Sequence, residues 1–230
     1  MIRKIFFDKN CVIDRQLSDR SNLESDLKSR GINYTNIALI NQIHSAEVLV
    51  IDDAAKIHGT QNLPKADAIV TNLPNLAIAV VTADCSPILL QDSSKKIIAA
   101  VHAGWRGAKA NIIAAAVEKM KNLGSNPQQI SADIGPMIHQ KSYQISQEFY
   151  DDFIVEDKNF AKFFQEDAAP NHYLFDLPAF VTHKLKEQNI TQINNVNIDT
   201  YISPDHASYR RGTHENNKEY GRNISLIVIE

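Results

Sequence analysis

The sequence predicts an α+β fold in which mixed β-sheets and helices pack in α/β-type layers, like a sandwich. Of the 230 residues, 43% are hydrophobic and 22% are charged, as in globular proteins, and the chain is long enough for a large core. Runs such as Leu76–Thr82 and Ile97–His102 are almost wholly apolar, which is typical of strands covered on both faces. Strands and helices do not alternate strictly, and no G-x-G-x-x-G motif occurs, which argues against a doubly wound nucleotide fold. We expect one domain over residues 1–230.

The N-terminal half is predicted to consist mainly of strands. A first strand covers Ile2–Phe7. A short helix follows over Asn22–Arg30, with Leu23 and Leu27 on one face and Gly31 at its end. Apolar runs bounded by turn residues predict the next strands: Ile37–Asn41, Glu47–Asp52, Ala66–Thr71, Leu76–Thr82, Pro87–Gln91 and Ile97–His102.

Helices are more frequent in the second half. The clearest one starts after the Gly104–Gly107 turn and runs to about Leu123, because apolar residues recur at helical spacing up to Met120. Asp176 and Pro178 mark the start of another helix. The remaining elements are predicted as a strand at Ser131–Ile134, helices at Ser146–Phe153, Asn159–Phe164 and Pro178–Gln188, and strands at Val196–Asp199 and Ile224–Ile229.

Composition excludes several classes of protein. The formal charge is 24 − 27 = −3 and no basic tract occurs, which argues against a dedicated nucleic-acid binder. The longest apolar run, Leu76–Val81, is far shorter than a membrane span, and Met1–Phe7 lacks the apolar core of a signal peptide. Two cysteines, Cys11 and Cys85, cannot form a disulfide framework. We therefore expect a cytoplasmic protein with a small-molecule site and neither a membrane nor a nucleic-acid partner.

Unusual side chains gather where three apolar strands end: residues 41–45, 81–87 and 100–107. They include His44, Cys85 and His102. Two imidazoles and a thiolate suit a catalytic zinc site, in which a fourth position is left to water. Their spacing alone does not make a metal motif, and a cysteine and two histidines packed in the core are the alternative.

Asp84 and Arg106 are candidates for supporting roles. Asp84 directly precedes Cys85, so it would orient a ligand imidazole or, equally, bond a loop amide as an ordinary strand-end carboxylate. Arg106 lies in a glycine-flanked turn that leads into a helix, where free amides and a guanidinium together favour a phosphate or carboxylate.

A second basic segment lies near the C-terminus. Arg210 and Arg211 would grip phosphate, and Tyr209 would stack on a base. A solvated basic turn is the alternative for this segment.

Seven motifs together resemble the YfiH-like family, also called the laccase-domain or multicopper polyphenol oxidase-like family, whose members are described as purine nucleoside phosphorylases. The resemblance covers about residues 35 to 230, and the A-D-C and H-A-G-W-R-G motifs are its most specific parts. The matching motifs are N-Q-I-H-S at 41–45, A-D-A-I-V-T at 66–71, T-A-D-C-S-P-I at 82–88, V-H-A-G-W-R-G at 101–107, I-G-P at 134–136, Y-R-R at 209–211 and G-R at 221–222.

This resemblance implies a zinc ion on His44, Cys85 and His102. It implies phosphorolysis of adenosine, inosine and methylthioadenosine, with adenosine deamination as a further activity. We expect Asp84, Cys85 and Arg106 to be catalytic. The residues expected to bind substrate or phosphate are Gln42, Arg106, Tyr209, Arg210 and Arg211. The implied fold is also likened to cysteine hydrolases of the cytotoxic-necrotising-factor type, and we expect a monomer or a weak homodimer.

The chain departs from the family pattern around the site. Residues 1–35 look shortened and lack an arginine- and glycine-rich T-R-x-G-G-x-S loop. After Gly135-Pro136, where the family often has C-C-Y-E-V-G, Ile138–Ser146 lacks the cysteine pair and the glutamate, and the family's C-T-Y is Asp199–Tyr201 here. These changes keep open a cell-wall peptide editing factor with little nucleoside activity. The same residues without a metal would also suit a hydrolase or amidase with Cys85 as nucleophile and His102 as base.

The laccase label itself does not fit the histidines. A multicopper oxidase takes most of its copper ligands from H-x-H pairs. This chain has eight histidines, His58 among them, and no two are separated by a single residue. Copper would therefore bind only adventitiously at the His-Cys-His set, and zinc is the expected metal.

Overall fold

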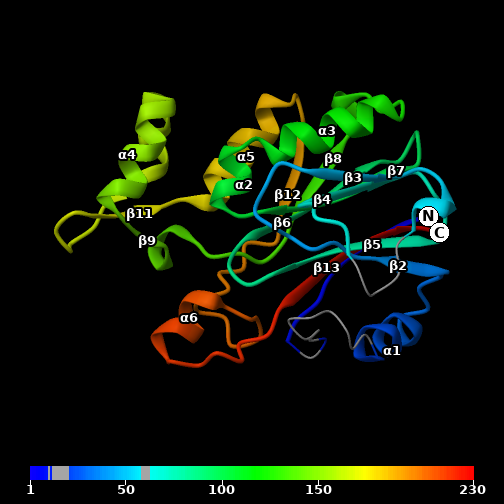
Figure 1. Cartoon of the computed structure of the whole chain (residues 1–230), viewed down its shortest axis with the longest axis horizontal. Coiled ribbons are helices and arrows are strands. Elements are labelled where there is room, and N and C mark those ends of the chain that lie inside the picture. Colours follow the sequence, from blue (N-terminus) through cyan, green and yellow to red (C-terminus); the bar gives the residue numbers. More distant parts are fainter. Residues whose placement is uncertain (10, 12–20, 58–62) are drawn as a thin grey trace.

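Two β-sheets pack face to face at the centre of the protein, in a computed structural model that describes residues 1–9, 11, 21–57 and 63–230 (Figure 1). Within these residues the larger sheet is mixed and has six strands. In order across the sheet they are β12 (Gln192–Asn195), β8 (Ser131–Ile134), β6 (Ser86–Asp92), β7 (Ile97–Ala103), β4 (Ala68–Thr71) and β3 (Val48–Ile51). The smaller sheet has the order β1 (Ile2–Phe6), β13 (Asn223–Ile229), β5 (Leu76–Thr82) and β2 (Asn36–Ala38).

The central strands are apolar throughout because both of their faces are buried. On β7, Ile98 and Ala100 face the smaller sheet, while Ile97, Ala99 and Val101 face the helices on the other side. Strands β5 and β13 alternate in the same way between the space between the sheets and the outer face of the smaller sheet. Successive side chains of a strand point to opposite faces, so each run contributes to two apolar layers. This arrangement confirms the predicted strands with two covered faces.

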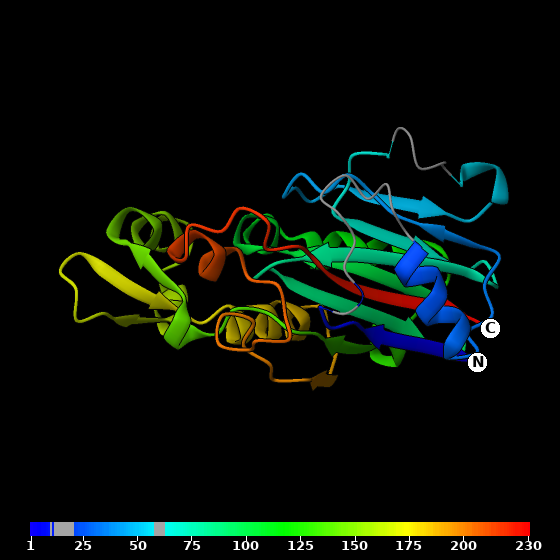
Figure 2. The ribbon, with the colours of Figure 1, turned by 90° about the horizontal axis from the view of Figure 1, so that it is seen from below.

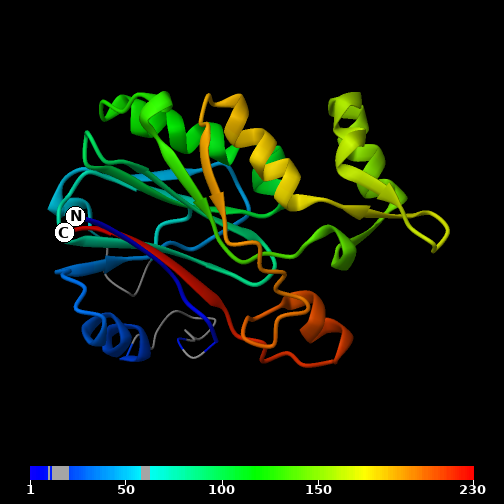
Figure 3. The ribbon, with the colours of Figure 1, turned by 180° about the vertical axis from the view of Figure 1, so that it is seen from behind.

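Helices close the outer faces of the two sheets (Figures 1 and 3). Against the six-stranded sheet pack α2 (Trp105–Lys109), α3 (Ile112–Asn122) and α5 (Leu177–Glu187). Helix α1 (Ser21–Ser29) covers the smaller sheet through Leu23 and Leu27. The layers are therefore helix, sheet, sheet and helix, as the predicted α+β fold requires. No helix in the described part of the chain has the length and apolar character needed to cross a bilayer.

A smaller unit extends one end of the layers (Figure 2). It contains α4 (Gln147–Glu156) and a three-stranded sheet in the order β10 (Phe164–Glu166), β11 (His172–Phe175) and β9 (Gln144–Ser146). Phe149, Phe153 and Phe175 pack there with ring centroids 5.0 to 5.4 Å apart. The last helix, α6 (Tyr209–His214), follows a loop after β12 and precedes β13. Single-turn 3-10 helices lie at Ala54–Lys56, Pro127–Gln129 and Gln140–Ser142, and a longer one at Lys158–Phe163.

The helix expected up to Leu123 is in fact two helices. Helix α2 begins within the G-W-R-G motif, with Gly104 as its N-cap, and ends at Lys109. Asn111 then adopts a left-handed conformation, with φ of 66°, and α3 starts at the next residue. Asparagine tolerates this region better than most residues, so a break here adds little strain.

Other predictions were wrong in detail. Residues 196–199 form no strand beyond a single bridge between Met137 and Asp199, and the strand at this place is β12, four residues earlier. The segment at Asn159–Phe164 is a 3-10 helix rather than an α-helix. Strands β9 to β11 and helix α6 were not predicted, because they are short and lack a clear apolar period. Residues 10 and 12–20 of the N-terminal region, and His58, lie outside the described residues.

Candidate metal centre and active-site cavity

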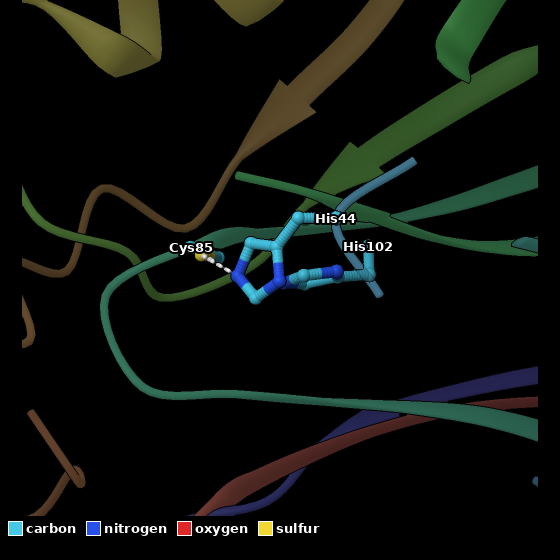
Figure 4. A group of neighbouring side chains, drawn as sticks. All are labelled: His44, Cys85 and His102. Atoms are coloured by element: carbon cyan, nitrogen blue, oxygen red, sulfur yellow. Dashed lines mark hydrogen bonds between the residues drawn. The ribbon is translucent and has the colours of Figure 1, made fainter. Parts of the chain in front are cut away.

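His44, Cys85 and His102 meet at one end of the two sheets (Figure 4). One ligand atom from each lies within 4.8 Å of the others. His44 Nε2 is 3.9 Å from Cys85 Sγ, and the two imidazole rings stand edge to face with centroids 4.8 Å apart. His44 belongs to the loop between β2 and β3, Cys85 to the β5–β6 turn and His102 to β7. Three segments that are distant in the sequence thus supply two nitrogens and a sulfur to one point.

Asp67, directly before β4, organises two of these three segments. Its side chain is fully buried. Its carboxylate accepts hydrogen bonds from His102 Nδ1 at 2.8 Å, from the amides of Ile43, His44 and Ser45 at 3.3, 2.9 and 2.6 Å, and from Ser45 Oγ at 2.7 Å. Burial alone raises the pKa of Asp67, but these donors outweigh it and lower the pKa to about 2. Asp67 is therefore a carboxylate at neutral pH and an acceptor for all five donors.

The hydrogen bonds to Asp67 determine the orientation of His102 and the backbone conformation at His44. Because a carboxylate only accepts, Nδ1 of His102 carries a proton, so Nε2 is the nitrogen that would give up its proton and offer a lone pair when a metal binds. The backbone at His44 is left-handed, with φ of 60°, which is uncommon for histidine. The consecutive amides of residues 43–45 point at Asp67, so the carboxylate holds the loop in this shape. Asp67 therefore fixes the orientation of the His102 ring and the backbone conformation at His44.

The Cys85 sulfur and the His102 imidazole shift each other's pKa values. Burial raises the pKa of Cys85, but the charge of His102 and hydrogen bonds with both imidazoles outweigh it and lower the pKa to about 6. Burial lowers the pKa of His102, but Cys85 and Asp67 outweigh it and raise the pKa to about 9. A thiolate beside an imidazolium is the result near neutral pH. Thiolate is the form of cysteine that binds metals and that attacks electrophiles.

These donors fit a late transition-metal ion such as zinc. Two imidazole nitrogens and one thiolate match a catalytic zinc site with one open position, and Asp67 supplies the carboxylate that such a histidine normally bonds. Gly104 also leaves room at this point. A Cβ at residue 104 would lie 2.7 Å from Cys85 Sγ and 3.2 Å from His44 Cδ2. Only glycine at residue 104 therefore lets the β7–α2 turn pass so close to Cys85 and His44.

A cavity of about 1060 Å³ opens over the three donors. The β5–β6 turn, α2, the segment 138–146 and the C-terminal segment 209–222 line it. Most residues expected to act on a substrate reach this cavity: Gln42, Asp84, Cys85, Arg106, Tyr209 and Arg210. Arg211 is absent from its lining.

For Asp84 the structure favours the plainer of the two predicted roles. Its carboxylate accepts from Thr200 Oγ1 and from the backbone amide of Arg210, each at 2.7 Å. Asp67, and not Asp84, bonds the imidazole of His102. Asp84 therefore connects the Cys85 turn to the start of α6. The carboxylate that orients His102 comes instead from Asp67, 35 residues upstream, and a catalytic role for Asp84 stays a prediction.

Gln42 and Arg211 both make hydrogen bonds to neighbouring backbone. Gln42 lines the cavity, but its amide group donates to the Val81 carbonyl and accepts from the Val81 amide, each at 2.8 Å, as a neighbouring strand would. The guanidinium of Arg211 donates to the carbonyls of Thr200, Tyr201, Ser203 and His206. Both side chains hold loops in place, and a role for either in substrate binding stays a prediction.

The arginines of the cavity rest on aromatic rings. Arg106 lies 4.2 Å from the ring centroid of Trp105, and in the described part of the chain no hydrogen bond or ion pair engages its guanidinium. Arg210 lies 5.6 Å from the ring of Tyr143 and donates to the Gln144 carbonyl. Because α2 is only five residues long, its dipole adds little, and Arg106 acts mainly through its own charge.

Sequence reasoning missed three residues of this site. Asp67 lies in the A-D-A-I-V-T motif, where an acidic residue leads into an apolar strand, and that contrast was the available signal. Tyr143 and Arg222 also line the cavity. No local pattern in the sequence indicates that either of them lines the cavity.

The fold and the site define a class of layered α+β proteins with a His-Cys-His centre at the end of two packed sheets. Within that class, the chain belongs to the family described as multi-copper polyphenol oxidoreductase laccase, whose sequence model matches residues 9–230. The sequence alone indicated this family.

Similar proteins carry a different functional name. The chain is 38% identical over 194 residues to a purine nucleoside phosphorylase of Rickettsia conorii, covering 84% of this chain and 78% of the relative. A purine nucleoside phosphorylase of Haemophilus influenzae is 33% identical over 219 residues, or 94% and 84% of the two chains.

Solved structures show the same fold. A Neisseria meningitidis protein described as a DUF152 family member matches with a TM-score of 0.82 and 26% identity, covering all of this chain and 94% of the other. The hypothetical protein YfiH of Bacillus licheniformis matches with a TM-score of 0.87 and 22% identity, covering all of this chain and 93% of the other. The second likeness bears on the fold alone.

Proposed function

We propose that this protein is a zinc-dependent purine nucleoside phosphorylase acting on adenosine, inosine and methylthioadenosine. The observation that carries the proposal is one cavity that combines the His44, Cys85 and His102 donors with the guanidiniums of Arg106 and Arg210. Phosphorolysis needs such a combination, because a phosphate dianion must be held while charge develops on the purine and the ribose. The name shared by the relatives of 33% to 38% identity supports the same activity.

Each side chain takes a defined task in this proposal. A zinc ion held by His44, Cys85 and His102 would supply a Lewis acid at that end of the cavity. Asp67 keeps the proton of His102 on Nδ1 and thereby orients the ring. Arg106 and Arg210 bind phosphate, and Tyr209, which is 56% exposed beside the cavity, packs against the purine.

Deamination of adenosine is a second activity that we propose for the same cavity. It would use the same donor set toward the purine ring instead of the ribose. The products separate the two reactions, because phosphorolysis of adenosine yields adenine and ribose 1-phosphate, whereas deamination yields inosine.

A cysteine hydrolase is the competing candidate, and one observation favours it. The pKa of Cys85 near 6 and that of His102 near 9 describe a thiolate–imidazolium pair, which is also how a nucleophilic cysteine is activated. The two candidates use the same residues and differ in whether a metal covers the sulfur.

The direct test is turnover of a nucleoside panel with and without phosphate, with chromatographic detection of the free base and of ribose 1-phosphate. We expect base release that requires phosphate and that is lost on treatment with a chelator and regained with zinc. Base release at equal rates without phosphate, or full activity after chelation with no metal bound, would contradict the proposal.

Replacing Arg106 with alanine should raise the KM for phosphate at least tenfold, equivalent to about 1.4 kcal/mol or more, because the cavity loses a guanidinium that no carboxylate of the described residues pairs. The KM for the nucleoside should change much less. Arg30→Ala is the matched control, since Arg30 is paired with Asp26 on α1, and it should leave both constants unchanged. An unaltered KM for phosphate in an active Arg106→Ala enzyme would remove Arg106 from the phosphate site.

A further inference from the structure

Tyr143 is a cavity residue to which the proposed function gives no task. It follows the 3-10 helix Gln140–Ser142, lies just before β9 and lines the same cavity as Cys85. In the described part of the chain, no hydrogen bond joins its hydroxyl to another residue. A tyrosine that is largely covered by protein normally finds a partner for its O–H. A free donor on a cavity wall is therefore available to a ligand.

The ring of Tyr143 is held in place without its hydroxyl. The guanidinium of Arg210 lies over it at 5.6 Å, and the rings of Phe149 and Phe175 meet it edge to face at 6.4 and 5.8 Å. The Tyr143 carbonyl accepts from the amide of Phe175 at 3.0 Å. These contacts use the ring and the backbone only, so loss of the oxygen atom would leave the packing intact.

The charges around the hydroxyl define what it can bind. Burial raises the pKa of Tyr143, and the charges of Cys85 and Asp84 raise it further, whereas Arg210 and Arg106 act in the opposite direction. The phenol therefore stays protonated at neutral pH and is a neutral donor. Arg210 lies over its ring, and Arg106 and Arg210 line the same cavity, so the hydroxyl belongs to the cavity that is assigned to phosphate.

We propose that the Tyr143 hydroxyl donates a hydrogen bond to the phosphate that Arg106 and Arg210 bind, as the third donor of that anion site. The two guanidiniums balance the dianion, and the phenol adds a directed bond without further charge. No proton is transferred in this role. The assignment rests on the proposed function for the identity of the reaction, but binding of inorganic phosphate can be measured without any turnover.

The test is the Tyr143→Phe variant, which removes one oxygen and keeps the ring. Calorimetric titration with inorganic phosphate should show about a tenfold weaker affinity than the wild type, as expected for losing a hydrogen bond to a charged group. Steady-state kinetics should show the same rise in the KM for phosphate and an unchanged KM for the nucleoside. Zinc content and the free energy of unfolding should match the wild type. Tyr173→Phe is the control, because Tyr173 stacks on Tyr150 at 4.2 Å outside the cavity lining.

The outcomes separate this assignment from the proposed function. Equal phosphate affinity in wild type and Tyr143→Phe would overturn it, as would a loss confined to nucleoside binding or a wild type that does not bind phosphate at all. If the wild type bound phosphate, the variant bound it tenfold more weakly and no nucleoside were cleaved, the phosphorylase proposal would fail while the Tyr143 contact would stand.

Discussion

Replacing Cys85 and His102 together with alanine should remove zinc from the protein and lower kcat/KM for phosphorolysis by more than a hundredfold. The double variant keeps only the imidazole of His44, and one ligand cannot hold the ion against water. Changes to the outer partners of metal ligands alone cost about 10- to 100-fold in affinity or activity, so loss of two ligands should cost more. Elemental analysis of the protein and nucleoside turnover measure the two effects.

A matched double variant checks that the effect belongs to the site. Cys11→Ala with His172→Ala removes the same two residue types from places outside the cavity, since Cys11 is buried against the smaller sheet and His172 starts β11. That variant should keep its zinc and its activity. Full zinc retention in the Cys85→Ala, His102→Ala protein would mean that these residues are not the ligands.

The second large effect is expected at Asp67. Asp67→Ala should lower the free energy of unfolding by about 3 to 5 kcal/mol, because it leaves the amides of residues 43–45, a hydroxyl and an imidazole N–H without their buried acceptor. Zinc affinity should fall as well, by about 10- to 100-fold, since His102 is no longer oriented. Denaturant titration and competition with a chelator measure the two quantities. Asp151→Asn, at an exposed position on α4, should change neither.

The contribution of Asp67 should also depend on pH in a defined direction. Its pKa in the folded protein is about 2, below the ordinary value of about 3.9 in the unfolded chain. The stability it supplies is therefore fully present above pH 4 and is lost as the pH falls toward 2. The difference in unfolding free energy between wild type and Asp67→Asn should narrow over this interval. A difference that stays constant from pH 5 to pH 2 would contradict the assigned hydrogen bonds.

The layered fold was predictable from the chain because its central strands carry a strong local signal. Ile97–Ala103 and Leu76–Thr82 are apolar along their full length, which follows directly from burial of both faces. The break at Asn111 was not predictable, since the apolar spacing of Ile112 to Met120 belongs to a helix wherever that helix starts. Strand β12, Gln192–Asn195, is polar and exists through its backbone pairing with β8, so no side-chain pattern reveals it.

The sequence likewise indicates the three metal donors of the site but not the residues that support them. His44, Cys85 and His102 stand where apolar strands end, and that position marked them as candidates before their distances were known. The contacts that support them form between loops that are distant in the sequence, and no local sequence pattern predicts which loops meet. Asp67 reaches His102 across a strand pair, whereas Asp84, the sequence neighbour of Cys85, faces the other way toward Thr200. Nothing in the sequence distinguishes Arg211 from Arg210, yet the guanidinium of Arg211 donates its hydrogen bonds to backbone carbonyls.

The central claim is that a metal, and not a substrate carbon, is the partner of the Cys85 sulfur. Native mass spectrometry of protein purified without chelator, before and after treatment with iodoacetamide, tests it most directly. The account predicts one zinc per chain, slow alkylation of Cys85 while zinc is bound, fast alkylation after chelation, and recovery of activity only when zinc is restored before the reagent is added. Active, metal-free protein whose Cys85 is alkylated at once with loss of activity, and whose unalkylated form traps a covalent substrate adduct on the sulfur, would contradict the metal centre and establish a cysteine nucleophile.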